Sequence, residues 1–337
     1  TLIDKTITMG NIMNKIIAVS LLLISAILFT ACSPKEDNNK VKLAFITNGA
    51  ADFWLYCQAG IQAAEKELGG KVSIVFKTGD GTTAKQKQIV NDLLVSGVKA
   101  ISISPTNPKD QRKDINEWAA EVPVICADSD AKGSNRITYL GTDNIAAGRQ
   151  CGELLKQALP QGGKVMVFVG LKDAPSAMER YQGLKEAVAG SNIVIIDLRT
   201  DNLDPAKARK NAEDTIAAYP DIKGMVGLWG YNAPQILQAV KGTGMLGKIA
   251  IVSFDEHPIT LTAIDKGEIF GTICQNPYEF GYRSAMLMYK LAVLGKSAAE
   301  AGIPQNKQII IPVKSITKGQ GMKYKKYCDG LKAQLNQ

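Results

Sequence analysis

The 337-residue sequence contains one histidine, His257. A single imidazole cannot build a metal centre of several histidines, and a relay triad needs a nucleophile and a carboxylate in partnership with its histidine. No nucleophile and base constellation stands out elsewhere in the sequence. We therefore expect no catalytic residues, no metal and no cofactor, which argues against an enzyme. His257 follows Asp255 by two residues and could either reach a ligand or lie unused on a loop.

The sequence also lacks the features of a nucleic-acid or nucleotide-binding protein. Its formal net charge is +8, from 40 Lys and Arg against 32 Asp and Glu, but the surplus is spread along the chain without interleaved aromatic residues. The glycine-rich segment 242–248 follows a predicted helix and precedes a strand, the reverse of the order that a phosphate loop requires. We expect it to be a helix stop and turn, and we expect no nucleic acid partner.

No apolar run is long enough to cross a bilayer, which takes about 20 residues. The longest run, residues 16–29, follows Lys15 and leads into Thr30-Ala31-Cys32. This order is typical of a bacterial lipoprotein signal peptide at residues 13–32, with lipidation of Cys32. We expect residues 1–12 to be an upstream artefact and residues 33–40 a tether, so the protein is periplasmic or extracytoplasmic and membrane-anchored. Ser33 leaves the membrane leaflet open.

Cysteine has little role in the expected framework. Besides Cys32, five cysteines remain, an odd number without metal-like spacing: Cys57, Cys126, Cys151, Cys274 and Cys328. Cys126 and Cys274 lie in apolar strand-like runs, where free cysteine behaves as a small hydrophobic residue. We predict that these two are buried free thiols, while a disulfide elsewhere stays open in an exported chain.

What the sequence does contain is a repeated alternation of strands and helices. Short apolar runs at 41–46, 73–76, 100–104 and 122–127 alternate with helical patterns at 53–68, 84–96 and 111–119. The alternation restarts with strands at 164–169, 193–198, 225–228 and 249–254 and helices at 177–189, 205–219 and 233–241. Asp204 before Pro205 predicts a helix start, and Gly69-Gly70 a helix end. The sequence predicts two similar doubly wound α/β domains with parallel sheets.

Polar and aromatic residues follow many of these strands. Ligands bind beyond the carboxyl ends of parallel strands, where neighbouring loops converge. The residues there include Asn48, Ser104, Asp128, Ser129, Trp229, Asp255 and Gln275. Aromatic faces cover the C–H side of a sugar ring and carboxylates and amides bond its hydroxyls, so this mixture predicts a polyhydroxylated ligand. Asp128 and Asp130 could form an acid/base pair, but we favour one facing the ligand and the other making a structural hydrogen bond.

Five motifs occur in one order along the chain: Phe53-Trp54 at a helix start, Asp128 after the fourth strand, Glu179-Arg180-x-x-Gly183, Phe254-Asp255 and Gln275-x-Pro277. In this order the chain resembles the ribose-binding class of type I periplasmic binding proteins, the sugar-binding subunits of ATP-driven importers. The resemblance covers residues 41–316. It implies that Phe53, Trp54 and Phe254 sandwich a sugar ring and that Asp128, Arg180, Asp255 and Gln275 bond its hydroxyls.

The departures from the ribose-binding pattern bear on the ligand. Ala51 and Ser104 stand where ribose binders carry asparagine, Ser129 replaces an arginine, Leu203 an aromatic residue, and Trp229 an asparagine. A hydroxyl that loses its buried partner costs about 1–3 kcal/mol. We therefore expect another monosaccharide or a related polyol.

The resemblance also implies a three-segment hinge. The expected domains are residues 41–142 with 276–303, and residues 143–275 with 304–337, so the chain crosses near 142–143, 275–276 and 302–305. Ligand would close the hinge, and a monomeric receptor would deliver the sugar to an ABC transporter permease. Two alternatives stay open: a sensor that signals to a membrane kinase or chemoreceptor, and an extracytoplasmic glycoside-processing enzyme.

Overall fold

The computed structural model describes residues 40–335. The predicted signal peptide, the lipidation site Cys32 and residues 33–39 of the predicted tether lie outside this range. Within it, no helix is both long and apolar enough to cross a membrane.

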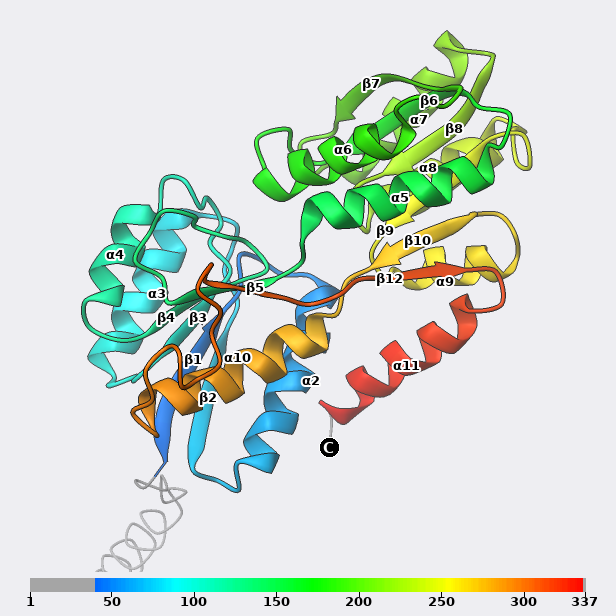
Figure 1. Ribbon diagram of the computed structural model, residues 1–337. Helices are drawn as coiled ribbons and strands as arrows, with labels where there is room; N and C mark the ends of the chain where they lie inside the picture. The colour runs from blue at the N-terminus through cyan, green and yellow to red at the C-terminus, as the bar shows by residue number, and fades with distance from the viewer. Residues whose placement is uncertain (1–39, 336–337) are drawn as a thin grey trace, which may run out of the picture. The chain divides into compact units, whose positions relative to one another are not determined.

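The first sheet has six parallel strands in the order β11-β5-β4-β3-β1-β2 (Figure 1). They are β1 (Val41–Ile46), β2 (Val72–Lys77), β3 (Ile101–Ile103), β4 (Val124–Ala127), β5 (Thr138–Gly141) and β11 (Gln308–Ile310). Helices cover both faces: α2 (Asp52–Glu67) and α10 (Pro277–Ala292) pack on one, α3 (Thr83–Val95) and α4 (Arg112–Ala119) on the other.

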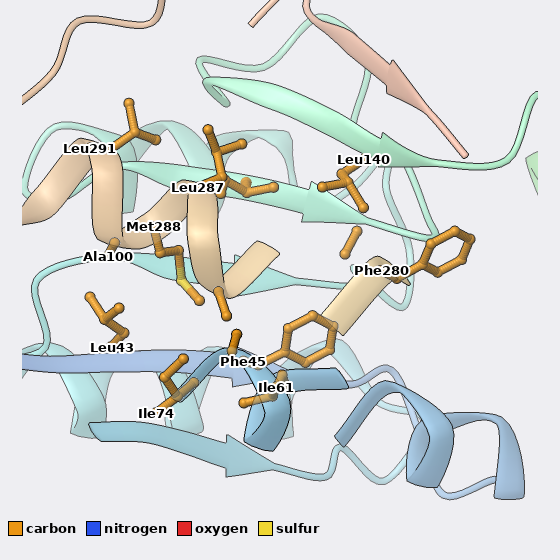
Figure 2. Packing of buried hydrophobic residues seen from close by; sticks show 14 of the residues in the cluster. Leu43, Phe45, Ile61, Ile74, Ala100, Leu140, Phe280, Leu287, Met288 and Leu291 are labelled. Carbon is orange, nitrogen blue, oxygen red and sulfur yellow. The ribbon is translucent and has the colours of Figure 1, made fainter. Parts of the chain in front are cut away.

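Alternation along β1 explains why this sheet is buried on both faces. Leu43 and Phe45 point into the cluster formed with α2 and α10, whereas Ala44 and Ile46 point into the cluster formed with α3 and α4. Figure 2 shows side chains of β1 and α10 directed into the same apolar layer, with Phe45 and Phe280 among them. All four β1 residues are fully buried, as expected for a parallel strand covered on both sides.

The second sheet repeats this plan in the order β12-β10-β9-β8-β6-β7. Its strands are β6 (Gly163–Val169), β7 (Ile193–Thr200), β8 (Ile222–Gly227), β9 (Ala250–Phe254), β10 (Gly271–Cys274) and β12 (Lys314–Thr317). Its helices are α5 (Asn144–Ala158), α6 (Pro175–Val188), α7 (Pro205–Ala218), α8 (Asn232–Gly242), α9 (Pro258–Asp265) and α11 (Gly321–Gln334). Only β12 of this sheet pairs antiparallel, with β10. The predicted pair of doubly wound α/β domains is confirmed.

The predicted helix boundaries are also confirmed. The Asp204 carboxylate accepts hydrogen bonds from the backbone amides of Ala206 (2.8 Å) and Lys207 (3.2 Å), and Pro205 opens α7. Gly69 and Gly70 follow α2 with φ of 61° and 78°, values that favour glycine. The segment 242–248 ends α8 and turns into β9, so it is a connection between a helix and a strand.

The third crossing between the two sheets lies later than the sequence predicts. We expected it near residues 302–305, but β11 pairs in parallel with β5, with Gln308 opposite Tyr139. The chain therefore passes to the second sheet between Ile310 and Lys314, where β12 begins. Three residues of extended chain were too weak a pattern to show the extra edge strand in the sequence.

Each half contains a helix pair whose backbones touch at glycine. A Cβ on Gly60 of α2 would lie 2.0 Å from the carbonyl oxygen of Tyr278, and a Cβ on Gly281 of α10 1.9 Å from that of Cys57. In the second half, a Cβ on Gly148 of α5 would lie 2.1 Å from the carbonyl oxygen of Arg180. The glycine of the Arg180-x-x-Gly183 motif completes that contact, because a Cβ on Gly183 of α6 would lie 2.0 Å from the carbonyl oxygen of Ile145.

The five cysteines within residues 40–335 are all buried and free. Cys126 and Cys274 lie in β4 and β10 and are completely buried, as predicted. The framework of both halves in the described part of the chain thus rests on packing without a disulfide.

Candidate functional site

Two aspartates occupy corresponding positions in the two halves. Asp128 directly follows β4 and Asp255 directly follows β9, with φ of 64° and 65°. The amide of Asp128 donates to the carbonyl oxygen of Leu140 (3.0 Å), and that of Asp255 donates to the carbonyl oxygen of Ile273 (2.8 Å). Non-glycine residues rarely adopt this left-handed conformation, and such outliers cluster at functional sites. Both strands therefore end by turning a carboxylate out of the strand direction.

Asp128 is held by polar groups of the first half. The hydroxyl of Ser104 donates to its Oδ2 atom (3.0 Å), and the hydroxyl of Tyr139 donates to its carbonyl oxygen (3.1 Å). Burial raises the pKa of Asp128 to about 6, although the positive charge of Arg180 and the bond from Ser104 act in the opposite direction. The Asp255 carboxylate adds to the rise in this pKa. Charged groups of both halves therefore act on one another at this point.

Arg180 is fixed by three groups of the second half. Its side chain is 4% exposed, Nε donates to Oδ1 of Asn144 (3.0 Å), and Nη1 donates to the carbonyl oxygen of Leu228 (2.8 Å). Nη1 also lies 3.9 Å from Oδ2 of Asp255. The guanidinium is 4.6 Å from the centre of the fully buried Phe254 ring, within the range of a cation–π contact. The Phe254 ring thus packs against the Arg180 guanidinium and helps to hold it in place.

Gln275 connects the Asp255 carboxylate to the first crossing. Its Nε2 donates to Oδ1 of Asp255 (2.9 Å), and its Oε1 accepts from the hydroxyl of Thr142 (2.8 Å). The other carboxylate oxygen of Asp255, Oδ2, accepts from the amide of Gly230 (3.1 Å). Thr142 and Asn144 were not among the predicted site residues. Their position beside the predicted crossing at 142–143 is the signal that could have found them.

Of the predicted aromatic residues, two lie at the start of α2. Trp54 is 5% exposed and packs on Phe45 with ring centres 6.1 Å apart. Phe53 is half-buried and meets Trp54 edge-on at 4.9 Å and Phe280 at 6.0 Å. Trp54 therefore belongs mainly to the apolar core, and Phe53 is the more accessible of the pair.

Trp229 is, with Phe254, one of the two predicted aromatic residues of the second half. It is half-buried, lies 6.4 Å from the Tyr231 ring, and has its amide bonded to Oδ1 of Asn232 (3.0 Å). A Cβ on Gly170 would lie 2.2 Å from the Trp229 ring. The loop after β6 must therefore carry a glycine at this point for the indole to fit.

Asp130, which also lines the cavity described below, makes the kind of structural bond that we expected of one of the two aspartates. Its carboxylate forms a two-pronged ion pair with Arg136, which is 5% exposed; Nη2 donates to Oδ2 at 2.8 Å and Nε donates to Oδ1. Nη1 of Arg136 donates to the carbonyl oxygen of Lys307 (3.0 Å). The pair therefore connects the loop after β4 to the segment before β11, and both carboxylate oxygens of Asp130 already accept hydrogen bonds from Arg136.

A cavity of about 390 Å³ is lined by residues of both halves. Asp128 and Ser129 line it from the first half, and Asn144 and Glu179 line it from the second. Burial raises the pKa of Glu179. The half-buried Asn48 is engaged through its carbonyl oxygen, which accepts from the amide of Gly81 (3.0 Å). The structure thus brings Ser104, Asp128, Arg180, Asp255 and Gln275 into one network, with Asp128 at the cavity.

His257 has a local structural role. Its Nδ1 accepts from the amide of Ile259 (3.2 Å) at the start of α9, and burial lowers its pKa. A neutral imidazole at a helix start satisfies one of the first amides of that helix.

Two α/β halves, three crossings and a polar network joining the strand ends define a two-domain ligand-binding protein. Residues 43–297 match the periplasmic binding protein domain, and the chain belongs to that family. It is 25% identical to the ribose import binding protein of Haemophilus influenzae over 299 residues, which cover 88% of this chain and 99% of the relative.

Solved structures have the same fold. A glucose-galactose binding protein from Geobacillus stearothermophilus is 25% identical, with a TM-score of 0.75 over 82% of this chain and 97% of the other. A protein named XylFII, in a complex with LytSN, is 26% identical, with a TM-score of 0.73 over 83% of this chain and 98% of the other. The chain is thus a periplasmic sugar-binding protein of the ribose-binding type, and the recognition made from its motifs is confirmed.

Proposed function

We propose that this protein captures a monosaccharide or a related polyol between its two α/β halves, closes about its hinge, and delivers the ligand to an ABC transporter permease. The observation that carries this proposal is the polar network that runs from Asp128 of the first half to Asp255 and Arg180 of the second. Its hydrogen bonds pass through Tyr139, Thr142 and Gln275. A ligand that bonds to both sides favours the closed arrangement by its differential affinity for it.

The chemistry of the network supports a polyol. Carboxylate oxygens accept hydrogen bonds from hydroxyl groups, and the guanidinium and amide nitrogens donate to them. The Asp128 carboxylate makes one side-chain hydrogen bond, from Ser104, and faces the cavity, so acceptor capacity is left for a ligand. The ribose and glucose-galactose binding relatives are named for ligands of this class.

Binding is tested by calorimetry with a panel of pentoses, hexoses and sugar alcohols, in parallel with intrinsic fluorescence. Asp128→Asn keeps the shape of the side chain but removes its charge, and we expect it to weaken binding of the cognate sugar at least tenfold. Asp214→Asn, on the exposed surface of α7, is the matched control and should bind as the parent does. A complete panel without heat or fluorescence change would contradict the proposal, as would full affinity in Asp128→Asn.

We also propose that the chain is anchored to the membrane through lipid on Cys32, which keeps the binding protein close to its permease and raises its effective concentration there. A single acyl chain holds weakly, so the anchor should carry more than one. Cys32→Ser should release the protein from the membrane fraction, with loss of the lipid mass. Membrane retention of this variant would rule the anchor out.

One observation favours signalling as an alternative to transport. The relative XylFII occurs in a complex with LytSN, so a member of this fold assembles with a further component. Stimulation of the ATPase of a reconstituted permease by the sugar-loaded protein supports transport, whereas sugar-dependent binding to a membrane kinase or chemoreceptor without such stimulation supports sensing. Hydrolysis of a chromogenic glycoside would instead support the glycoside-processing alternative.

A further inference from the structure

A small pocket lies where the C-terminal helix α11 contacts α2. Its volume is about 10 Å³, which is room for one occupant of the size of a water molecule. Tyr56, Tyr278, Tyr324 and Tyr327 line it together with Glu256 and Cys328. The pocket therefore combines four aromatic side chains with one carboxylate.

The carboxylate of Glu256 is buried and incompletely bonded. The residue is 5% exposed, and its Oε2 atom has no hydrogen-bond partner within residues 40–335. Burial and the neighbouring Asp255 carboxylate raise the pKa of Glu256 well above its usual range. The raised pKa means that Glu256 keeps its proton while the pocket holds no cation, because a buried carboxylate needs a counter-charge in order to ionise.

The nearest positive side chains are engaged elsewhere. Arg180 lies over Phe254 and beside Asp255. Lys332 forms an ion pair with Asp52 at 2.6 Å, and its Nζ atom is 5.3 Å from the Tyr56 ring. Neither of them makes an ion pair with Glu256 among the described residues. When Glu256 loses its proton, its negative charge therefore has no direct counter-charge within residues 40–335.

Size and charge restrict the occupant. An anion is repelled by Glu256 and by Asp255. A divalent cation usually takes several carboxylate oxygens, and no group of three or more His, Cys, Asp and Glu suited to a metal is found in residues 40–335. An organic ammonium such as choline exceeds the volume. A monovalent cation of water size fits, because one carboxylate neutralises it and tyrosine rings and hydroxyls attract it.

We propose that this pocket binds a water-sized monovalent cation, of the potassium or ammonium type, held by the carboxylate of Glu256 and faced by the tyrosine side chains. The walls come from different parts of the fold: Tyr56 from α2 of the first half, Tyr278 from the start of α10 after the second crossing, and Tyr324 and Tyr327 from α11. The cation holds α11 on α2, at a place distinct from the cavity that Asp128 lines.

The test is thermal unfolding of the sugar-free protein in potassium, ammonium, sodium and choline chloride at constant ionic strength. A cation that binds only the folded protein raises the Tm, by about 5 °C or more at a hundredfold excess over its Kd. We expect the Tm to rise and saturate with potassium or with ammonium, and the four salts show which of the two ions binds. We expect no rise in Tm with choline. Equal Tm values in all four salts would overturn the proposal, because a water molecule or a proton on Glu256 gives no cation-specific rise.

Two variants locate the effect. Glu256→Gln is isosteric and should abolish the cation-dependent rise, whereas Glu121→Gln, on the exposed surface, should keep it. Tyr327→Leu changes a half-exposed wall of the pocket with little risk to folding and should raise the half-saturating concentration several-fold. A cation-dependent rise that persists in Glu256→Gln would place the ion elsewhere. A crystal soaked in thallium(I) acetate should show anomalous density beside Glu256, and its absence there would likewise count against the site.

Discussion

Gly148→Ala should both destabilise the second half and weaken sugar binding. The added Cβ would lie 2.1 Å from the carbonyl oxygen of Arg180, and that atom belongs to the α6 backbone, so no side-chain rotation relieves the contact. The two helices must separate by about 1 Å in a close-packed interior. Arg180 moves with α6, and its 2.8 Å bond to the carbonyl oxygen of Leu228 and its contact with Phe254 lengthen.

The magnitude follows from two opposing effects. Overpacking of this kind costs about 1–3 kcal/mol and occasionally more, while alanine in place of glycine favours a helix by about 1 kcal/mol. We expect a net loss of about 1–2 kcal/mol, because a backbone atom yields less than a side chain. Gly330→Ala on α11 is the matched control: no atom lies within 4 Å of its Cβ, so only the stabilising effect applies.

The assay is urea unfolding monitored by tryptophan fluorescence, and it depends on where the tryptophans lie. The chain has three, of which Trp54 and Trp118 lie in the first half, so Trp229 alone reports on the second half when the other two are replaced by phenylalanine. Urea unfolding in that background should give a lower midpoint for Gly148→Ala and an equal or higher one for Gly330→Ala. Calorimetry with the cognate sugar should show weaker binding in Gly148→Ala only. A midpoint for Gly148→Ala at or above that of the control would refute the argument from helix spacing.

Four further predictions concern charge. Because the pKa of Asp128 is about 6 and a sugar hydroxyl bonds its ionised form, affinity should fall about tenfold from pH 7 to pH 5 in calorimetry, and Asp128→Asn should lose this dependence. Because the pKa of Asp128 is higher in the folded state than in the unfolded state, this residue stabilises the folded protein below pH 4. The contribution, up to about 3 kcal/mol, is lost as the pH rises through 6. Urea unfolding of the parent and of Asp128→Asn below pH 4 and above pH 6 measures it, and identical pH profiles of the free energy of unfolding would contradict the prediction. Ser104→Ala removes a hydrogen bond to that carboxylate, so the midpoint of the affinity profile should move to higher pH; a downward shift would contradict the assignment. Arg136→Ala leaves the half-buried Asp130 carboxylate without its partner and should cost about 1–3 kcal/mol in urea unfolding. Arg209→Ala breaks an exposed pair and should change little. Similar effects of both variants would show that burial does not control the first pair.

Buried strands and capped helices were predictable because each depends on a local pattern. The runs that became β1 and β9 are mostly apolar, and Asp204-Pro205 encodes a helix start by itself. β11 is only three residues long and half-exposed, and its place in the first sheet depends on pairing with β5, more than 160 positions earlier in the chain. Pairing over such a separation leaves no local pattern to read.

The candidate site residues likewise divide into those marked by a local sequence pattern and those placed by contacts between distant segments. The places of Asp128 and Asp255 were predictable because each directly follows a strand, and strand ends have a fixed meaning in parallel sheets. Thr142 and Asn144 were missed because their roles arise only when the first crossing lies beside Gln275 and Arg180. The sequence marks Trp54 as an aromatic residue at a helix start, but only packing against Phe45 shows that it is mostly core.

The buried, free cysteines have a practical consequence for measuring the ligand. Thiolates are the reactive form of cysteine, and burial raises the pKa of Cys126, Cys151 and Cys328 to about 12. A chain that starts after Cys32 should therefore react slowly with maleimide dyes at neutral pH, without removal of any native cysteine. A single cysteine in place of the exposed Lys132, at the rim of the cavity, would then carry the only fluorophore and turn the protein into an optical reporter of its own sugar.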